Sequence, residues 1–382
     1  MGSLKCWENW FRSLQGVDCS STGRVVNLTI ANFVGRGAPG NFSANPKAKN
    51  IGASLGALSE LQNLIMYNVN FSAPIPKEWG NFRKLVTLLL QNSQFTGELP
   101  SSLGQLTELE SFSISDASFT NGMPASFCNL VELTYLYLSG TNLQSVPACL
   151  SSKLTKLTQL GLSYNQLKGP FPTWMTLFPA LTELDLSLNQ LSGPIPAAIG
   201  NMKKLQYFYL SNNQLSGYIP RTVGGLSSLN YFDVYNNSLT GPLPKEFSQL
   251  KNITGLSLGQ NFLTGPLPDL SQAPQLQTVD LSFNNITGTI PAAWGNLKVT
   301  SIYINLNNNL LTGMSKICAL LLWLAFVDHC WLVWSCNEYW VPEWLLCPLE
   351  PVALSGVTPN ASIKLIWYFR KRSNIREKRA FK

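Results

Sequence analysis

The sequence has little charge and almost no histidine. Of its 382 residues, 12% are Asp, Glu, Lys or Arg, which is about half the share usual in globular proteins. Hydrophobic residues make up 45%, so a mainly disordered chain is excluded. The single histidine is His329. Any mechanism that needs two histidine ligands or a histidine base upstream of the last third of the chain is therefore excluded.

The excess of positive charge is confined to one end of the chain. The formal net charge is +7, which at first suggests a nucleic-acid or membrane partner. Residues 370–382, however, contain seven Lys or Arg residues and one acid, Glu377, and so carry +6 of that total. The rest of the chain sums to +1, and we expect no nucleic-acid partner.

Motifs of catalysis and export are missing as well. The sequence has no Gly-rich phosphate loop, no His-Arg-Asp and no Asp-Phe-Gly, so no kinase domain is predicted. Residues 1–5 lack the apolar core of a signal peptide. We expect either a truncated start or a protein that is not exported.

A leucine repeat with a period of 24 residues runs through most of the chain. Each copy follows L-x-x-L-x-L-x-x-N-x-L-x-G-x-I/L-P, best seen in residues 181–196. Alternating leucines are typical of a short strand that turns its apolar side chains inward. Glycine then permits the turn, and proline ends the strand. The copies begin at Leu61, Leu85, Leu109, Leu133, Leu157, Leu181, Leu205, Leu229, Ile253, Leu276 and Ser301.

One copy cannot bury its own core, so successive copies must stack. We predict an α/β solenoid, a curved superhelix of about 11 repeats with a parallel β-sheet on its concave face and an irregular, non-repeat C-terminal tail. The predicted domains are residues 1–30, an N-terminal cap and first strand; 31–60, an irregular insertion; 61–313, the repeats; and 314–382, a hydrophobic and basic tail.

The ninth position of the copy is occupied unevenly. In the later copies it is asparagine, whose side chain can hydrogen-bond backbone groups where a strand turns, so stacking predicts a ladder of amides. Ser93 and Thr141 keep hydrogen-bonding capacity there, whereas Val69 and Ala117 do not. We expect the first third to be less regular and less stable than residues 157–300. The asparagines are Asn165, Asn189, Asn213, Asn237, Asn261, Asn284 and Asn309.

The consensus L-x-x-L-x-L-x-x-N-x-L-x-G-x-I-P resembles the plant-specific class of leucine-rich repeat over residues 61–313. That class occurs in ectodomains of receptor-like kinases, in receptor-like proteins and in polygalacturonase-inhibiting proteins. The resemblance implies a secreted protein and a disulfide between Cys6 and Cys19. The residues that resemble the family's cysteine-paired cap and first strand are Cys6, Trp7, Trp10, residues 16–19 and residues 23–28.

Sequons and further cysteines bear on the compartment. Six N-x-S/T sequons fall before the tail, and with a cap-like cysteine pair they favour an extracellular or plasma-membrane protein, although Asn-rich repeats generate some sequons by chance. Cys128 and Cys149 lie on the outer side of neighbouring copies, either as a disulfide or as two small buried thiols. The predicted glycosylation sites are Asn27, Asn41, Asn70, Asn236, Asn252 and Asn285.

Residues 314–382 do not continue the repeat. They contain six of the 11 tryptophans and four of the eight cysteines, which lack zinc-like spacing, so no metal and no cofactor is expected. A membrane is a further candidate partner through residues 317–336, but Asp328 within this apolar stretch would cost about 3 kcal/mol. Three interpretations stay open: a membrane-associated tail, an aberrant or poorly ordered tail, and a C-terminal cap.

Outward strand positions gather seven of the 12 tyrosines into copies four to eight. Solenoids of this kind bind with the concave face, and tyrosine offers a large rigid contact area with a polar tip. Carboxylates beside it favour a basic partner or sugar hydroxyls. Alternatively, tyrosine is simply tolerated on a half-exposed sheet. The predicted ligand-binding residues are Tyr135, Tyr137, Tyr164, Glu183, Asp185, Tyr207, Tyr209, Tyr231, Asp233 and Tyr235.

Three functions remain open. The first is an extracellular recognition module of receptor-like type, without a kinase domain, that binds a peptide or a co-receptor kinase on its concave face. The second is a secreted inhibitor of a cell-wall polysaccharide hydrolase. The third is a truncated gene product without independent function. Enzyme activity is not expected, because Asp185 and Asp233 lie about 10 Å apart on an open face where nothing raises the pKa of either carboxyl.

Overall fold

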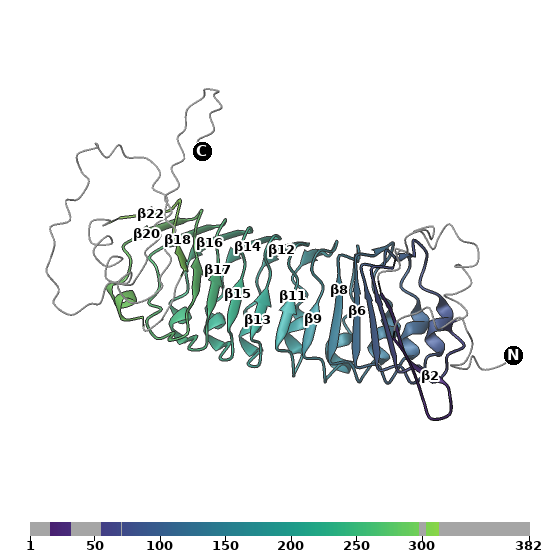
Figure 1. The fold of residues 1–382 in the computed structure, drawn as a ribbon. Helices are drawn as coiled ribbons and strands as arrows, with labels where there is room; N and C mark the ends of the chain where they lie inside the picture. Colours follow the sequence, from purple (N-terminus) through teal and green to yellow (C-terminus); the bar gives the residue numbers. More distant parts are fainter. Residues whose placement is uncertain (1–15, 32–54, 70, 298–302, 313–382) are drawn as a thin grey trace, which may run out of the picture.

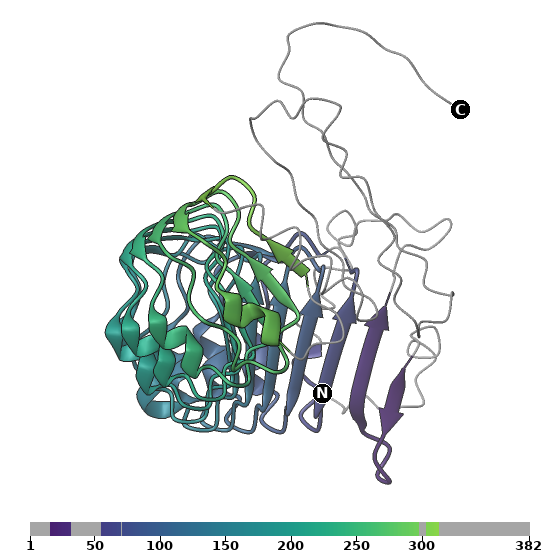
Figure 2. The ribbon, with the colours of Figure 1, turned by 90° about the vertical axis from the view of Figure 1, so that its left-hand side faces the viewer.

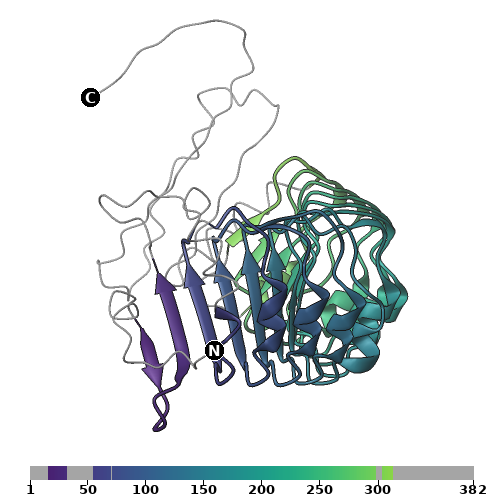
Figure 3. The same ribbon diagram turned by 90° about the vertical axis from the view of Figure 1, so that its right-hand side faces the viewer.

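The repeat folds into a curved stack in which each copy makes one turn (Figure 1). The computed structural model describes residues 16–31, 55–69, 71–297 and 303–312. Seen from its two ends, the stack has strands along one side and short helical turns along the other (Figures 2 and 3). The predicted α/β solenoid with a parallel sheet is confirmed.

The concave face is one long sheet, with 13 strands in the described part of the chain. All neighbours are parallel except the first pair, β1 (Val17–Cys19) and β2 (Val25–Ala31). The strands align by copy, so that Glu183 pairs with Tyr207, one repeat further on. The others are β3 (Asn63–Tyr67), β4 (Thr87–Gln91), β6 (Ser111–Ser115), β8 (Tyr135–Ser139), β9 (Gln159–Gly161), β11 (Glu183–Asp185), β13 (Tyr207–Tyr209), β15 (Tyr231–Asp233), β17 (Gly255–Ser257), β19 (Thr278–Asp280) and β21 (Tyr303–Asn305).

The core lies between this sheet and the outer turns. The leucines at the first, fourth and sixth positions of each copy point into it, as Leu181, Leu184 and Leu186 do. Phenylalanines extend the core along the stack, and the rings of Phe208 and Phe232 in neighbouring copies lie 5.8 Å apart. Each buried side chain of this size contributes roughly 1.5–3 kcal/mol, so the stack as a whole supplies the stability that one copy lacks.

The outer side is built from short 3₁₀ helices that begin directly after the repeat's proline. These turns stack closely: a Cβ on Gly80 would meet the carbonyl oxygen of Ser102 at 2.5 Å, so this position needs glycine. Only copy four has an α-helical turn instead among the described residues, α2 (Leu150–Lys153). The 3₁₀ turns are η3 (Lys77–Asn81), η4 (Ser101–Gln105), η5 (Ala125–Asn129), η6 (Thr173–Leu177), η7 (Ala197–Asn201), η8 (Arg221–Gly225), η9 (Lys245–Gln249) and η10 (Ala292–Asn296).

The predicted asparagine ladder is present. In a representative copy, the Asn189 amide donates to the carbonyl of Leu186, at 3.1 Å, and to that of Leu162 in the preceding copy, at 2.9 Å. Its Oδ1 accepts from the backbone N–H of Leu167, at 3.0 Å. Each ladder asparagine repeats this arrangement between its own copy and the preceding one.

A second parallel sheet, which the sequence did not predict, runs beside the ladder. Its strands begin where the ladder's Oδ1 atoms hold the backbone, as at Leu191, whose N–H donates to Asn213. The strands are β10 (Lys168–Pro170), β12 (Gln190–Pro194), β14 (Gln214–Tyr218), β16 (Ser238–Pro242), β18 (Phe262–Gly265), β20 (Asn285–Gly288) and β22 (Leu310–Leu311). In the early copies this place holds only the pair β5 (Thr96–Gly97) and β7 (Ser118–Phe119) and a single parallel bridge between Pro74 and Thr96 among the described residues.

Residues 55–60 lie inside the predicted insertion but belong to the packed stack, because Leu55 and Leu58 are buried. Residues 32–54 of that segment lie outside the described part, as do residue 313 and the predicted tail, 314–382. The proposed membrane segment 317–336 falls within that tail. In the residues that the structure describes, no helix is long and apolar enough to cross a membrane.

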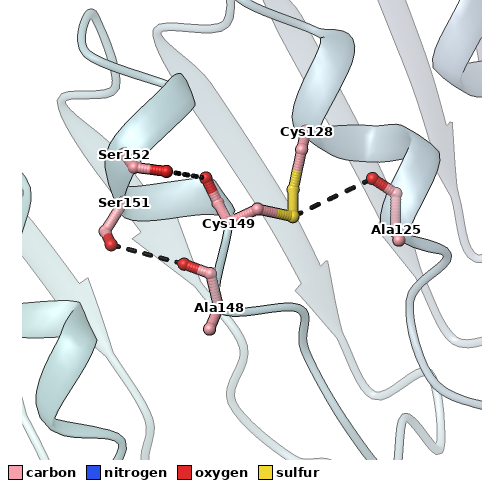
Figure 4. The surroundings of a disulfide bond; sticks show 6 residues. All are labelled: Ala125, Cys128, Ala148, Cys149, Ser151 and Ser152. Atoms are coloured by element: carbon pink, nitrogen blue, oxygen red, sulfur yellow. Dashed lines mark hydrogen bonds between the residues drawn. A yellow bond between two sulfur atoms is a disulfide. The ribbon is translucent and has the colours of Figure 1, made fainter.

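Cys128 and Cys149 form a disulfide between η5 and the start of α2 (Figure 4). Of the two alternatives left open by the sequence, the disulfide is therefore correct. Cys128 stands at the position where Gly80 and Gly104 allow close stacking. Cys19 is also disulfide-bonded, while its predicted partner, Cys6, lies outside the described residues.

Candidate binding face

Two columns of side chains project from the concave sheet. The third positions of successive copies stand beside one another, and so do the fifth positions, because the strands pair copy by copy. From β3 to β21 neither column contains a Lys or Arg. The two columns are therefore mainly polar and aromatic, with Ile65 and Leu89 at their upstream end, and their only formal charges are the carboxylates of copies six, eight and ten.

The first group of predicted residues spans copies four to six. The rings of Tyr135 and Tyr137 stack with centroids 4.3 Å apart. The Tyr137 ring extends across the next strand, over Gly161, where an added Cβ would lie 2.2 Å from Cδ1 of the ring. Its hydroxyl donates to Oε1 of Glu183 at 2.5 Å. Glycine on the intervening strand thus lets a tyrosine and a carboxylate two copies apart form one unit.

The second group lies in copies seven and eight. Tyr207 and Tyr209 are stacked with centroids 6.4 Å apart, and Tyr231 packs against Tyr209 at 5.7 Å. The Tyr231 ring covers Gly255 in the next copy, where an added Cβ would lie 2.3 Å from Cε2 of the ring. These rings are half-exposed, so they form a continuous aromatic surface rather than a core.

Burial raises the pKa of these phenols. The pKa of Tyr209 is raised to about 12, mainly by burial and then by the negative charge of Glu183. Burial and the hydrogen bond to Glu183 raise the pKa of Tyr137 still further. Burial also raises the pKa of Tyr231, with Asp233 adding to it. A phenol is protonated at neutral pH even at its ordinary pKa of about 10, and the raised values keep these hydroxyls protonated well into the alkaline range, available as hydrogen-bond donors.

The aspartates of the fifth column are held by their own turns. Oδ1 of Asp185 accepts from the N–H and the hydroxyl of Ser187, at 2.9 and 2.6 Å. Oδ1 of Asp233 accepts from the N–H of Tyr235 at 2.9 Å. These bonds fix each carboxylate on the face and leave Oδ2 without a hydrogen bond to the part of the chain that the structure describes.

The face extends beyond the residues predicted from the sequence. Asp280 occupies the fifth column two copies after Asp233, and its Oδ1 accepts from Ser282 in the same turn. The pKa of Tyr303 in the third column is raised by burial and by Asp280. Both residues stand in the same columns as the predicted ones, so their position in the repeat could have identified them. The prediction was limited to copies four to eight, where tyrosines are most frequent, and therefore left them out.

Two predicted residues stand apart from the two columns. Tyr235 is the seventh residue of its copy, and Tyr164 is an eighth residue with left-handed backbone, φ 56°. Tyr164 is 67% exposed and makes no ring contact with the other tyrosines in the described structure. Every described copy is left-handed at the eighth position, which marks it as the turn at the edge of the sheet. Its members are Asn68, Asn92, Asp116, Gly140, Tyr164, Leu188, Asn212, Asn236, Gln260, Phe283 and Asn308.

Of the sequons, Asn27 lies within β2 and its amide donates to Asp18 at 3.0 Å. Asn236 is exposed at the edge of the concave face, and its amide donates to Asn212 at 2.9 Å. Asn252 and Asn285 are exposed away from that face. Asn41 and Asn70 lie outside the described residues. Within the described residues no group of three or more His, Cys, Asp or Glu side chains is placed to hold a metal ion.

The comparisons with known proteins agree with this geometry. A leucine-rich repeat family model matches residues 155–215, 179–239 and 203–263, and a second leucine-rich repeat model matches residues 84–106 and 275–297. A search of curated proteins found no match.

Solved structures share the fold. The plant peptide hormone receptor RGFR1, in complex with RGF2, is 32% identical over 68% of this chain and 42% of its own, with a TM-score of 0.63. The Arabidopsis receptor kinase HAESA, in complex with the peptide hormone IDA and the co-receptor SERK1, is 30% identical over 85% of this chain and 60% of its own, with a TM-score of 0.66. A plant ice-binding protein, 24% identical over 78% of this chain and 84% of its own, shares the fold alone, with a TM-score of 0.56.

The stacked turns and their inward leucines define a leucine-rich repeat protein. More particularly, the Gly-x-I/L-Pro element and these relatives show that the chain belongs to the plant type of that family. The chain spans 42% and 60% of the lengths of the two receptors.

Proposed function

We propose that the protein is a recognition module of receptor type that binds a peptide or protein ligand on its concave face, outside the cell. The observation that carries the proposal is the aromatic surface of Tyr207, Tyr209 and Tyr231, in which Asp185 and Asp233 flank Tyr209 within the fifth column. Protein ligands are typically anchored by such tyrosines, which add contact area at a small entropic cost.

The extracellular part of the proposal is supported by the disulfide between Cys128 and Cys149, because such bonds persist in oxidising compartments. The similar RGFR1 and HAESA structures are complexes with RGF2 and with the peptide hormone IDA. Glycans at Asn252 and Asn285 would leave the concave face open, whereas a glycan at Asn236 would stand at its edge and restrict access.

The test is a selection followed by a matched comparison. Random dodecapeptides displayed on phage are selected on the full chain, and recovered peptides are titrated by biolayer interferometry. Replacing Tyr207 and Tyr209 by Ala and Asp233 by Asn together should weaken binding about 100-fold, because two anchoring rings are lost. The control replaces Tyr218 by Ala and Asp269 by Asn, an exposed tyrosine on the second sheet and an exposed aspartate of an outer loop.

The control should bind like the unchanged protein. Circular dichroism must show that both variants retain the fold. Undiminished binding by the concave-face variant, or a selection that recovers no peptide, would overturn the proposal.

A further inference from the structure

The acidic side chains of the concave face have a regular spacing. In the fifth column, Asp185 lies on β11, Asp233 on β15 and Asp280 on β19, with Tyr209 and Ser257 on the strands between them. Neighbouring strands are about 4.8 Å apart, so successive carboxylates lie about 9.6 Å apart along the array. Because each Oδ1 is held by a turn, this spacing is a fixed property of the surface.

A ligand on this face must be recognised through side chains. The inner strands pair with a neighbour on each side, so their backbone N–H and C=O groups are used within the sheet. Addition of a further strand, which reads the ligand's backbone, is confined to a sheet edge. The ligand therefore lies across the strands and contacts projecting rings and carboxylates.

The aromatic surface and the spacing both fit one backbone conformation. A polyproline II helix has three residues per turn and rises about 3.1 Å per residue, so every third side chain returns to one face after about 9.3 Å. Aromatic-lined surfaces are the usual docking sites for this conformation. A β-strand ligand does not match, since its third residues alternate between two faces.

We propose that the ligand is a basic peptide in the polyproline II conformation, running across the strands with Lys or Arg at every third position. This inference rests on the proposed function, because it names the class of ligand for the same face. Three successive cations pair with Asp185, Asp233 and Asp280. Between the first two stands the partly exposed ring of Tyr209, against which the prolines of such a peptide would pack, and the columns hold no basic side chain that would compete for the carboxylates.

The probes are two fluorescein-labelled peptides of the same composition. The first is (Lys-Pro-Pro)₄, which places its ammonium groups about 9.3 Å apart; the second carries four consecutive lysines followed by eight prolines. Fluorescence anisotropy with the full chain at low ionic strength should show the first peptide binding about tenfold more tightly. Raising the salt concentration should weaken its binding, because the paired charges are partly exposed.

The protein variants test whether the preference for the first peptide depends on the three spaced carboxylates or on negative charge elsewhere on the protein. Replacing Asp185, Asp233 and Asp280 together by Asn keeps an oxygen to accept the turn hydrogen bond but removes the charge, and should abolish the tenfold preference. Asp269→Asn is the matched control, since Asp269 accepts from Ser271 in the same kind of turn on the outer side, and should leave it unchanged.

Equal binding of the two peptides, or a preference that persists in the triple Asn variant, would overturn the inference. Selected dodecapeptides keep the two proposals distinguishable. If they require Tyr207 and Tyr209 but carry no basic residue at every third position, the inference fails while the proposed function stands. If selection recovers no peptide for the face, both fail.

Discussion

Two stretches of the array share the same leucines but differ at the ninth position of the repeat. In the upstream block, residues 61–156, this position is Val, Ser, Ala or Thr, and neighbouring copies pair along four or five residues of their strands. In the downstream block, the described part of residues 157–312, it is Asn, and the strands pair along three residues. The seven-stranded second sheet lies only in the downstream block.

The difference shows what the asparagine does. Its side-chain amide donates hydrogen bonds to the sixth-position carbonyls of its own copy and of the preceding one, as Asn189 does to those of Leu186 and Leu162. Those carbonyls are then bound by the amide rather than by the neighbouring strand, so regular pairing ends at the fifth position. Beyond it, neighbouring copies share separate backbone bonds, such as that from the Leu188 N–H to the Ser211 carbonyl. The Oδ1 atom then holds the N–H that starts a strand of the second sheet. One amide thus shortens the first sheet and anchors the second.

The largest effect is expected when one side-chain amide is removed from the asparagine ladder. Asn213→Ala removes the partners of the Leu186 and Leu210 carbonyls and of the Leu191 N–H. Each buried group left unpaired costs about 1–3 kcal/mol, so we expect a loss of roughly 4 kcal/mol in the free energy of unfolding, measured by urea denaturation.

Its counterpart upstream is Thr141→Ala, which removes a hydroxyl bound to the Leu138 carbonyl and to Oδ1 of Asn165. Both acceptors keep other partners, so the change should cost about 1 kcal/mol. Hydrogen exchange of the Leu191 amide should accelerate only in the Asn213 variant. Equal losses in the two variants would contradict the distinction between the blocks.

The upstream block has a covalent tie in place of the amide. The disulfide between Cys128 and Cys149 joins copies three and four and closes a loop with a sequence separation of 21. Replacing both cysteines by Ser should lower the free energy of unfolding by about 3 kcal/mol. Hydrogen exchange of the backbone amides in η5 and α2 should become faster in this variant. Unchanged exchange there would argue against a stabilising role of the disulfide.

The two blocks are also joined on the concave face, by Tyr137 of the upstream block and Glu183 of the downstream block. Gly161→Ala would push a methyl group into the Tyr137 ring and should cost about 2 kcal/mol. In a Tyr137→Ala background the same change should cost little, because the ring is gone. A double-mutant cycle in urea measures this coupling; additive losses would mean that the ring does not depend on the glycine.

The smallest expected effect is the contribution that Tyr209, in the downstream block, makes to alkaline sensitivity. The pKa of Tyr209 is raised from 10.0 to about 12 in the folded protein. Up to pH 10 the phenol is protonated in both states; between pH 10 and 12 only the unfolded chain loses the proton, so stability falls as the pH rises. Since Tyr209 is partly exposed, we expect a contribution of only about 1 kcal/mol.

Urea denaturation at pH 9 and pH 11 measures the alkaline effect. Tyr209→Phe should reduce the fall between the two pH values, whereas Thr87→Ala, at an outward position of the upstream block, should not. A fall of the same size in all three proteins would show that Tyr209 does not contribute.

Much of the architecture could be predicted, because the leucine period and the asparagine ladder act through local, repeated geometry. The register of the columns followed from the same period and placed Tyr207 beside Tyr231 correctly. The second sheet could not be predicted, since its strands contain the Gly and Pro that normally end a strand. Asp280 lies outside the tyrosine-rich copies, so only its place in the fifth column indicates that it belongs to the same face as Asp233. Their role in binding a ligand stays a prediction.

The tyrosines that cross to a neighbouring strand have one more consequence. Tyr137 lies over Gly161 and Tyr231 lies over Gly255, and in both cases the glycine belongs to the following copy. Both rings therefore tilt towards the same end of the array, and the surface is not the same when followed in the opposite direction. A peptide and its reversed sequence carry identical side chains but would meet different edges of these rings, so two glycines give the face a polarity.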